Sequence, residues 1–180
     1  MKTIRTLCFV VAVLSFMSLA VPGLASSESG TATIPLDQLK MIPMDRARAQ
    51  SIELPASLVQ RAGAWSDVEV GPTLYQRNWW YKTTFSRGSI YVPPGSLISQ
   101  VAWQWGVTNR YDGLLVWLGY VSGGNFYYID ISSWGSGTST AFNTLPADMD
   151  FEIWFGYTGT GMLNPPTYGQ SDTVIVSWYP

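Results

Sequence analysis

The sequence contains no histidine, and its single cysteine, Cys8, lies near the N-terminus. Without an imidazole or a second thiol, the chain cannot assemble a Ser-His-Asp or Cys-His catalytic arrangement. Zinc, copper and haem sites lose their usual protein ligands for the same reason. We therefore expect no metal site, no cofactor and no catalytic residue of these classes, and the sequence favours a protein that is not an enzyme.

Charged residues are also scarce. They make up 12% of the 180 residues, whereas aromatic residues reach 14%, with nine Trp and ten Tyr. Disordered chains show the opposite bias, with much charge and few aromatics, so the composition predicts a folded domain with ample apolar area to bury. The formal net charge is −2. Because no basic patch is visible, we do not expect a nucleic-acid partner.

The first 25 residues have the pattern of a secretory signal peptide. Lys2 and Arg5 precede an almost wholly apolar run, and small residues follow at 23–25. The run of roughly 16 residues is shorter than the ~20 that a membrane-spanning helix needs. We expect cleavage near Ala25, a secreted product and no stable membrane anchor afterwards. An exported domain without disulfides favours a bacterial protein.

Residues 26–63 differ from the rest of the chain. From residue 26 to residue 62 there is no Trp, Tyr or Phe, and charges and three prolines are scattered through the segment. Two short stretches, 36–41 and 56–62, could form a helical turn or two, but each is too short to be stable alone. We interpret this segment as a linker, an irregular arm or a pro-segment.

From residue 64 onward, apolar and polar residues alternate, and turn residues interrupt the pattern every eight to twelve positions. This spacing predicts an all-β domain, an antiparallel β-sandwich of about eight strands over residues 64–180. The longest predicted loop covers 159–171 and contains Pro165-Pro166. The candidate strands are 64–70, 74–86, 89–92, 97–108, 114–121, 126–133, 138–142, 151–158 and 173–179.

One short sequence recurs within this domain. Residues 116–120 read Val-Trp-Leu-Gly-Tyr, and residues 153–157 read Ile-Trp-Phe-Gly-Tyr. The recurrence could mark a repeated binding face. We favour a structural explanation, in which equivalent strands of two facing sheets meet the same packing requirement.

Alternation also separates the two faces of each predicted strand. In 97–108, 151–158, 79–85 and 126–133, one face is apolar and is expected to form the core. The opposite faces combine rings with polar groups, which suits stacking on a pyranose and hydrogen bonding to its hydroxyls. The candidate ligand-binding residues on these faces are Trp80, Lys82, Gln104, Tyr128, Asp130, Glu152 and Trp154. An open alternative is that a second layer, such as the N-terminal arm, covers these rings.

The leading functional hypothesis is a secreted, non-catalytic binding protein that uses surface aromatics to recognise a carbohydrate or another cell-surface ligand. One alternative is a secreted membrane-active toxin of the bacteriocin kind, because Trp and Tyr favour the lipid headgroup region. Another is a structural protein of an extracellular matrix. A glycoside hydrolase with Asp130 and Glu152 as its carboxylate pair is the least favoured hypothesis.

Overall fold

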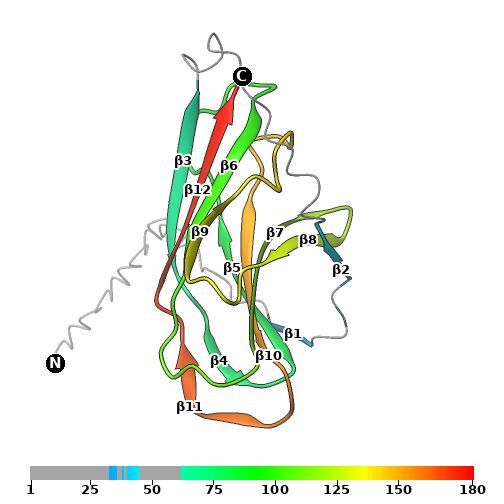
Figure 1. The fold of residues 1–180 in the computed structure, drawn as a ribbon, viewed down its shortest axis with the longest axis vertical. Coiled ribbons are helices and arrows are strands. Elements are labelled where there is room, and N and C mark those ends of the chain that lie inside the picture. The colour runs from blue at the N-terminus through cyan, green and yellow to red at the C-terminus, as the bar shows by residue number, and fades with distance from the viewer. Residues whose placement is uncertain (1–32, 36–37, 39, 45–61) are drawn as a thin grey trace, which may run out of the picture.

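The structure, a computed structural model, describes residues 33–35, 38, 40–44 and 62–180 (Figure 1). The predicted signal peptide and the predicted helical turn at 56–62, except its last residue, lie outside these ranges. Within them, the regular elements are all strands, and no helix is long and apolar enough to cross a membrane. The strands are β1 (Thr33–Pro35), β2 (Met41–Pro43), β3 (Gly63–Val70), β4 (Thr73–Gln76), β5 (Trp79–Phe85), β6 (Leu97–Gln104), β7 (Leu114–Ser122), β8 (Asn125–Asp130), β9 (Ser136–Ser139), β10 (Phe151–Tyr157), β11 (Met162–Tyr168) and β12 (Ser171–Tyr179).

Two sheets form the two layers of the molecule. The larger sheet has the strand order β1-β5-β10-β7-β8-β2, and the smaller has the order β3-β12-β6-β9 (Figure 1). Strands β4 and β11 form a separate two-stranded sheet at one end. Neighbouring strands run antiparallel except β2 and β8, which are parallel. The predicted all-β class is confirmed.

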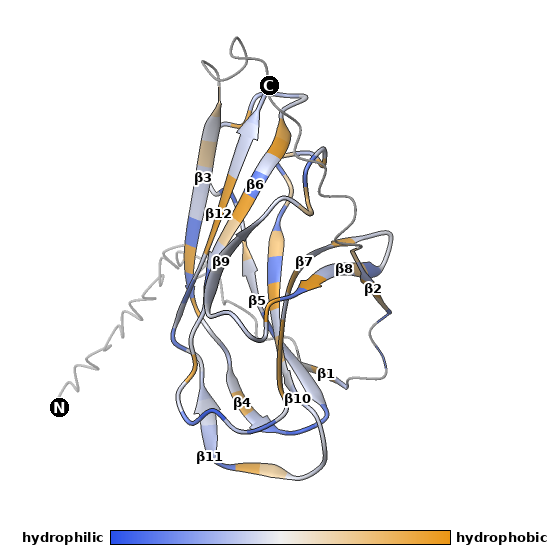
Figure 2. Cartoon of the chain, viewed as in Figure 1, coloured by the Kyte–Doolittle hydropathy of each residue, from blue (hydrophilic) through white to orange (hydrophobic). Residues whose placement is uncertain are grey.

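The core lies between the two sheets and is built by the alternation seen in the sequence. Val101, Trp103 and the following Trp105 are buried on the inner side of the smaller sheet. From the larger sheet, Phe155 and the other inward residues of β10 are fully buried against them. The ring centroids of Trp105 and Phe155 are 6.0 Å apart. Figure 2 shows apolar residues along strands of both sheets, as expected for facing layers that share one core.

The structure differs from the predicted strands at three places. The predicted strand 74–86 is divided into β4 and β5 by a turn in which Asn78 has a φ of 64°. Apolar character continues through this turn, so alternation does not reveal it. Residues 89–92 form no strand, because they lie between turns. The predicted loop 159–171 contains β11, which pairs irregularly with β4.

The N-terminal arm also differs from its prediction. A helical turn was expected over 36–41, but Met41 begins strand β2, whose three residues pair with Phe126–Tyr128 of β8. Strand β1 pairs with β5 at the opposite edge of the same sheet. Edge strands leave backbone N–H and C=O groups free, and these groups draw short segments into extended pairing.

The recurring sequence lies on neighbouring strands of one sheet, so its assignment to two facing sheets was wrong. Strands β7 and β10 are antiparallel neighbours, and Trp117 lies directly opposite Trp154. The repeat therefore places two tryptophans side by side on the outer face of the larger sheet.

Candidate functional site

Six of the seven predicted site residues lie on the outer face of the larger sheet, because β10 and β7 connect β5 to β8 in register. The strands β5, β10 and β8 contribute two residues each: Trp80 and Lys82, Glu152 and Trp154, Tyr128 and Asp130. Gln104 does not join them. It lies on the exposed side of β6, in the other sheet, so placing it in this group was wrong.

The rings of this group are not freely exposed. Trp80 has no exposed surface and Trp154 has 1%, so the expectation that these two rings face solvent was wrong. They form a second apolar cluster with Phe126, onto which Ile34 and Met41 of the N-terminal arm pack. These two contacts are what the described residues show of the alternative that the N-terminal arm lies against the rings.

We call the five rings on this side of the sheet the aromatic face: Trp80, Trp117, Phe126, Tyr128 and Trp154. Trp117 is its centre. Its ring centroid lies 4.3 Å from that of Trp80 and 4.2 Å from that of Tyr128, with only 18° between the planes of Trp117 and Tyr128. Trp117 and Tyr128 are partly buried, so this stacked pair is the part of the aromatic face nearest to solvent.

Glu152 is engaged by two neighbours. Its Oε1 lies 2.5 Å from Lys82 Nζ, and its Oε2 accepts a hydrogen bond of 2.8 Å from Trp154 Nε1. The ammonium of Lys82 also lies 5.5 Å from the centroid of the Trp154 ring. Since both carboxylate oxygens are occupied and the residue is buried, this geometry gives no support to Glu152 as a catalytic acid or base.

Asp130 has a different environment. It is exposed, and its Oδ1 accepts hydrogen bonds from the backbone N–H of Ser132 at 2.9 Å and from its hydroxyl at 2.6 Å. The carboxylate is therefore held in a fixed position at the end of β8. Burial, and secondarily the negative charge of Asp130, raise the pKa of the neighbouring Tyr128, so this phenol stays protonated and able to donate a hydrogen bond.

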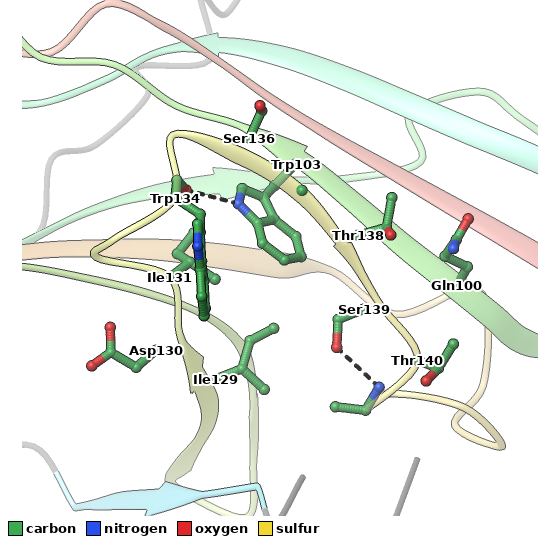
Figure 3. Close-up of a pocket in the computed structure, with 12 residues that line it drawn as sticks. Gln100, Trp103, Ile129, Asp130, Ile131, Trp134, Ser136, Thr138, Ser139 and Thr140 are labelled. Carbon is green, nitrogen blue, oxygen red and sulfur yellow. Dashed lines mark hydrogen bonds between the residues drawn. The ribbon is translucent and has the colours of Figure 1, made fainter. Parts of the chain in front are cut away.

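A groove of about 640 Å³ lies beside Asp130, between the ends of β8 and β9 (Figure 3). Its polar side chains are mainly amide and hydroxyl groups, and its apolar part comes from two isoleucines and two tryptophans. The lining residues are Gln100, Trp103, Ile129, Asp130, Ile131, Trp134, Ser136, Gly137, Thr138, Ser139, Thr140 and Ala141.

Trp134 is the exposed ring of this groove, with 51% of its surface accessible. Its loop is fixed from below, because its carbonyl oxygen accepts hydrogen bonds from Trp105 Nε1 at 2.8 Å and Trp103 Nε1 at 3.2 Å. The backbone N–H of Trp105 also donates to the carbonyl of Gly135 at 2.7 Å. Hydrogen bonds from core residues thus fix the loop that presents the Trp134 indole at the surface.

Sequence reasoning missed Trp134 because it belongs to no alternating strand. The available signal was a lone tryptophan between Ser132-Ser133 and Gly135-Ser136-Gly137, in a segment rich in small polar residues. Turn segments lie at the surface, so a tryptophan in such a segment is a candidate surface ring.

The groove can therefore offer a ring for stacking, a carboxylate and several hydroxyls to a bound molecule. The guanidinium of Arg110 donates a hydrogen bond of 3.0 Å to the carbonyl oxygen of Ser132. In the part of the chain that the structure describes, no three His, Cys, Asp or Glu residues are placed to hold a metal ion. The chemistry available here is that of reversible binding to a polar ligand with apolar faces.

The similarities found to known proteins are to solved structures. No family model matches the chain, and no curated protein does. Among solved structures, FlhE has a TM-score of 0.53 and 28% sequence identity, covering 66% of this chain and 97% of FlhE. A serine protease of Aeromonas sobria gives a TM-score of 0.46 at 10% identity, covering 72% of this chain and 28% of the protease. PliG of Aeromonas hydrophila, a periplasmic lysozyme inhibitor of g-type lysozyme, gives 0.31 at 10% identity, covering 77% of this chain and 96% of PliG.

Proposed function

We propose that this protein is an exported, non-catalytic carbohydrate-binding protein whose ligand lies in the groove beside Trp134. The observation that carries the proposal is the half-exposed indole of Trp134, whose loop is held by hydrogen bonds from the core. It lies in one groove with the carboxylate of Asp130 and several hydroxyl groups. Sugar rings have an apolar face and a polar rim, and this combination binds both.

The preorganisation of the groove supports a binding role. The carboxylate of Asp130 is positioned by Ser132, and the Trp134 loop by two indole N–H groups from the core. A site whose groups are already oriented loses less conformational entropy when a ligand binds. Because sugars give weak individual contacts, a site for them gains most from such order.

The charge of the groove narrows the ligand class. Asp130 is its one charged lining residue, and the other polar lining groups are neutral. A neutral glycan suits this lining, whereas a sulfated or acidic glycan would meet a carboxylate of the same sign. The volume of about 640 Å³ lies within the usual range for ligand sites and accommodates a few sugar units.

The location of the protein belongs to the same proposal. The signal-peptide pattern of residues 1–25 supports export, and a binding protein outside the cytoplasm meets polysaccharides at a cell surface or in the surrounding matrix. The target is then a glycan of the producing cell or of a neighbour.

The test is calorimetric titration of the chain beginning at residue 26 with cellobiose, cellohexaose and chitohexaose. We expect Trp134→Ala to weaken binding at least tenfold, because it removes the stacking ring. Asp130→Asn should weaken binding less, since an amide retains part of the hydrogen bonding. Tyr91→Ala is the matched control, because Tyr91 is a 73% exposed ring that does not line the groove, and it should bind like the parent.

Two results would overturn the proposal. One is the absence of binding by the parent chain to any of the three sugars and to insoluble cell-wall glycan. The other is undiminished binding by Trp134→Ala, which would mean that the sugar lies elsewhere on the molecule.

A further inference from the structure

The groove runs along β9, which is an outer strand of the smaller sheet. All four residues of β9, Ser136–Ser139, line the groove (Figure 3). Among the described strands, β9 pairs only with β6. Residues at the end of β8, Ile129 to Ile131, line the groove as well. One wall of the groove is therefore the open edge of a sheet.

The register of β6 and β9 decides which backbone groups of β9 lie on that edge. Residues directly opposite each other in an antiparallel pair alternate between hydrogen-bonded and non-hydrogen-bonded positions. The N–H of Trp105 donates to the carbonyl of Gly135, so the hydrogen-bonded positions on β9 are the odd-numbered residues. The N–H and C=O groups of Ser136 and Thr138 therefore point away from β6, with the two residues about 6.8 Å apart. We call these backbone groups of Ser136 and Thr138 the edge groups.

The edge groups have no hydrogen-bond partner among the residues that the structure describes. An edge of this kind is a template for a further strand, and proteins usually protect it. The other three edges of the two layers are protected. Strands β1 and β2 have three residues each and end in Pro35 and Pro43, and on β3 the carboxylate of Asp67 accepts the N–H of Val68. Strand β9 contains neither proline nor a charged residue, so its edge is open to pairing.

The inner side of β9 offers apolar surface to the side chains of an added strand. A Cβ at Gly137 would come within 2.6 Å of Trp103 Cζ2, so only glycine lets this indole lie against the strand. Ile129 and Ile131 also line the groove. The even-numbered residues of β9, by contrast, are exposed. A strand beside β9 would therefore place every second side chain against apolar groups and the others in solvent.

The position of the edge inside a groove favours a single chain over a second copy of the protein. Trp134 is 51% exposed and precedes β9 by two residues, and the end of β8 lines the same groove. A volume of about 640 Å³ holds a short extended segment but not the edge of another two-layered domain.

We propose that the ligand of the groove is a glycopeptide, an extended polypeptide segment that carries a sugar. This inference rests on the proposed function of the groove and names its ligand class. The peptide pairs with the edge groups as a fifth, antiparallel strand of the smaller sheet. Because an antiparallel strand ends where β9 begins, its last residue lies nearest to Trp134, and the sugar on that residue stacks on the indole.

The first experiment compares ligands by calorimetric titration of the chain beginning at residue 26. The probe is the peptide Thr-Val-Thr-Val-Thr, blocked at both ends, whose last threonine carries cellobiose or chitobiose, whichever the parent binds. The free disaccharide and the peptide without sugar are the comparisons. We expect the glycopeptide to bind about tenfold more tightly than either, because strand pairing and stacking then act in one molecule.

Two modified glycopeptides test the pairing without changing the protein. In an antiparallel strand, the N–H groups directed at the edge groups belong to residues whose side chains lie on the exposed side, which are the threonines of the probe. N-methylation of the central threonine should abolish the gain over the free disaccharide. N-methylation of the second valine, whose N–H points away from β9, should preserve it. Equal affinity of the two modified glycopeptides would refute strand addition.

The protein variant Thr138→Pro removes one edge donor. The N–H of Thr138 is not bonded to β6, so proline at this position leaves the ladder between β6 and β9 intact. We expect the ratio of glycopeptide affinity to disaccharide affinity to fall from about ten to about one. Thr138→Val is the matched control, because it keeps the N–H and should keep the ratio. Thermal unfolding followed by circular dichroism checks that both variants are folded.

The outcomes separate the two proposals. If the parent binds no sugar, or Trp134→Ala binds the disaccharide like the parent, the function proposed for the groove fails. If the disaccharide binds through Trp134 but the glycopeptide binds no more tightly, the glycopeptide inference alone is refuted. It is also refuted if the parent is a dimer in sedimentation that Thr138→Pro dissociates, because a second copy then occupies the edge.

Discussion

Asp172 is the most unusually placed titratable residue of the domain. It has no exposed surface, its Oδ1 accepts a hydrogen bond of 3.3 Å from the N–H of Gly106, and its Oδ2 is buried without a partner. A Cβ at Gly71 would come within 2.6 Å of Oδ2, so only glycine leaves room for the carboxyl there. Burial, opposed by the Gly106 hydrogen bond, raises its pKa from 3.8 to about 7.

Stability should depend on pH through this residue. Between about pH 4 and pH 7, the folded protein keeps the Asp172 proton while the unfolded chain has lost it, so the free energy of unfolding falls as pH rises across this window. Above pH 7 the loss is complete. Asp172→Asn should flatten the dependence and raise the melting temperature at pH 8, where it removes a buried charge.

The measurement is urea unfolding of the parent and Asp172→Asn at pH 5 and pH 8. Asp148→Asn serves as the control, because Asp148 is exposed and its substitution should leave the slope unchanged. An identical pH dependence in parent and Asp172→Asn would show that other groups set it.

At the scale of single elements, the conformation of the surface loop 131–135 is fixed by hydrogen bonds from core residues. Trp103 and Trp105 alternate into the core from β6 and from the residue just after it, yet their indole N–H groups reach outward to the carbonyl of Trp134. The same two residues therefore fill the interior and hold the groove.

Replacing Trp105 with phenylalanine should separate these two roles. Trp105→Phe keeps an aromatic ring in the core but removes the 2.8 Å hydrogen bond to the Trp134 carbonyl. We expect the free energy of unfolding to fall by about 1–2 kcal/mol. We also expect the affinity for sugar to fall more in this variant than in Phe155→Leu. Phe155→Leu, which changes the core beneath without touching this hydrogen bond, is the comparison. Equal losses of affinity in both variants would show that the hydrogen bond from Trp105 does not position Trp134 for binding.

Alternation predicts most of the elements because it follows directly from how strands pack. The inner faces of β6 and β10 were predicted from the positions of Trp103 and Phe155, and both residues are buried. The break between the predicted strands 114–121 and 126–133 is also present, and Gly123 and Gly124 there have φ values of 57° and 76°. The turn at Asn78 and the pairing of β11 were missed, because neither interrupts or creates a two-residue period.

The candidate site was only partly predictable, for a related reason. Periodicity places Trp80, Tyr128 and Trp154 away from the core, and the sheet does bring them to one side. It gives no information on what lies above that side, so alternation alone could not decide between exposed and buried positions for Trp80 and Trp154. Nor could alternation reveal a ring on a loop such as Trp134.

At the scale of the whole molecule, Asp67 joins the two layers. It lies on β3, the edge strand of the smaller sheet, where its Oδ1 accepts a hydrogen bond from the N–H of Val68 at 2.9 Å. Its Oδ2 accepts another from the N–H of Ser86, just beyond β5 of the larger sheet, also at 2.9 Å. A carboxylate in this position both ties the layers together and blocks pairing at the edge.

Asp67→Ala should therefore destabilise the domain by about 1–3 kcal/mol and increase its aggregation on heating. Glu69→Ala is the matched control, because Glu69 occupies the same strand and the same side. Differential scanning calorimetry and light scattering check both effects. Similar behaviour of the two variants would show that the links from Asp67 are dispensable.

The pairing of the arm imposes an order on assembly. Thr33 pairs with Tyr81 and Met41 pairs with Phe126, so residues synthesised early find their partners only after some 48 and 85 further residues have been made. Closing such long loops is slow compared with forming hairpins such as β7–β8. During folding, strands β1 and β2 are thus the last members of the larger sheet to find their partners, although they come first in the chain.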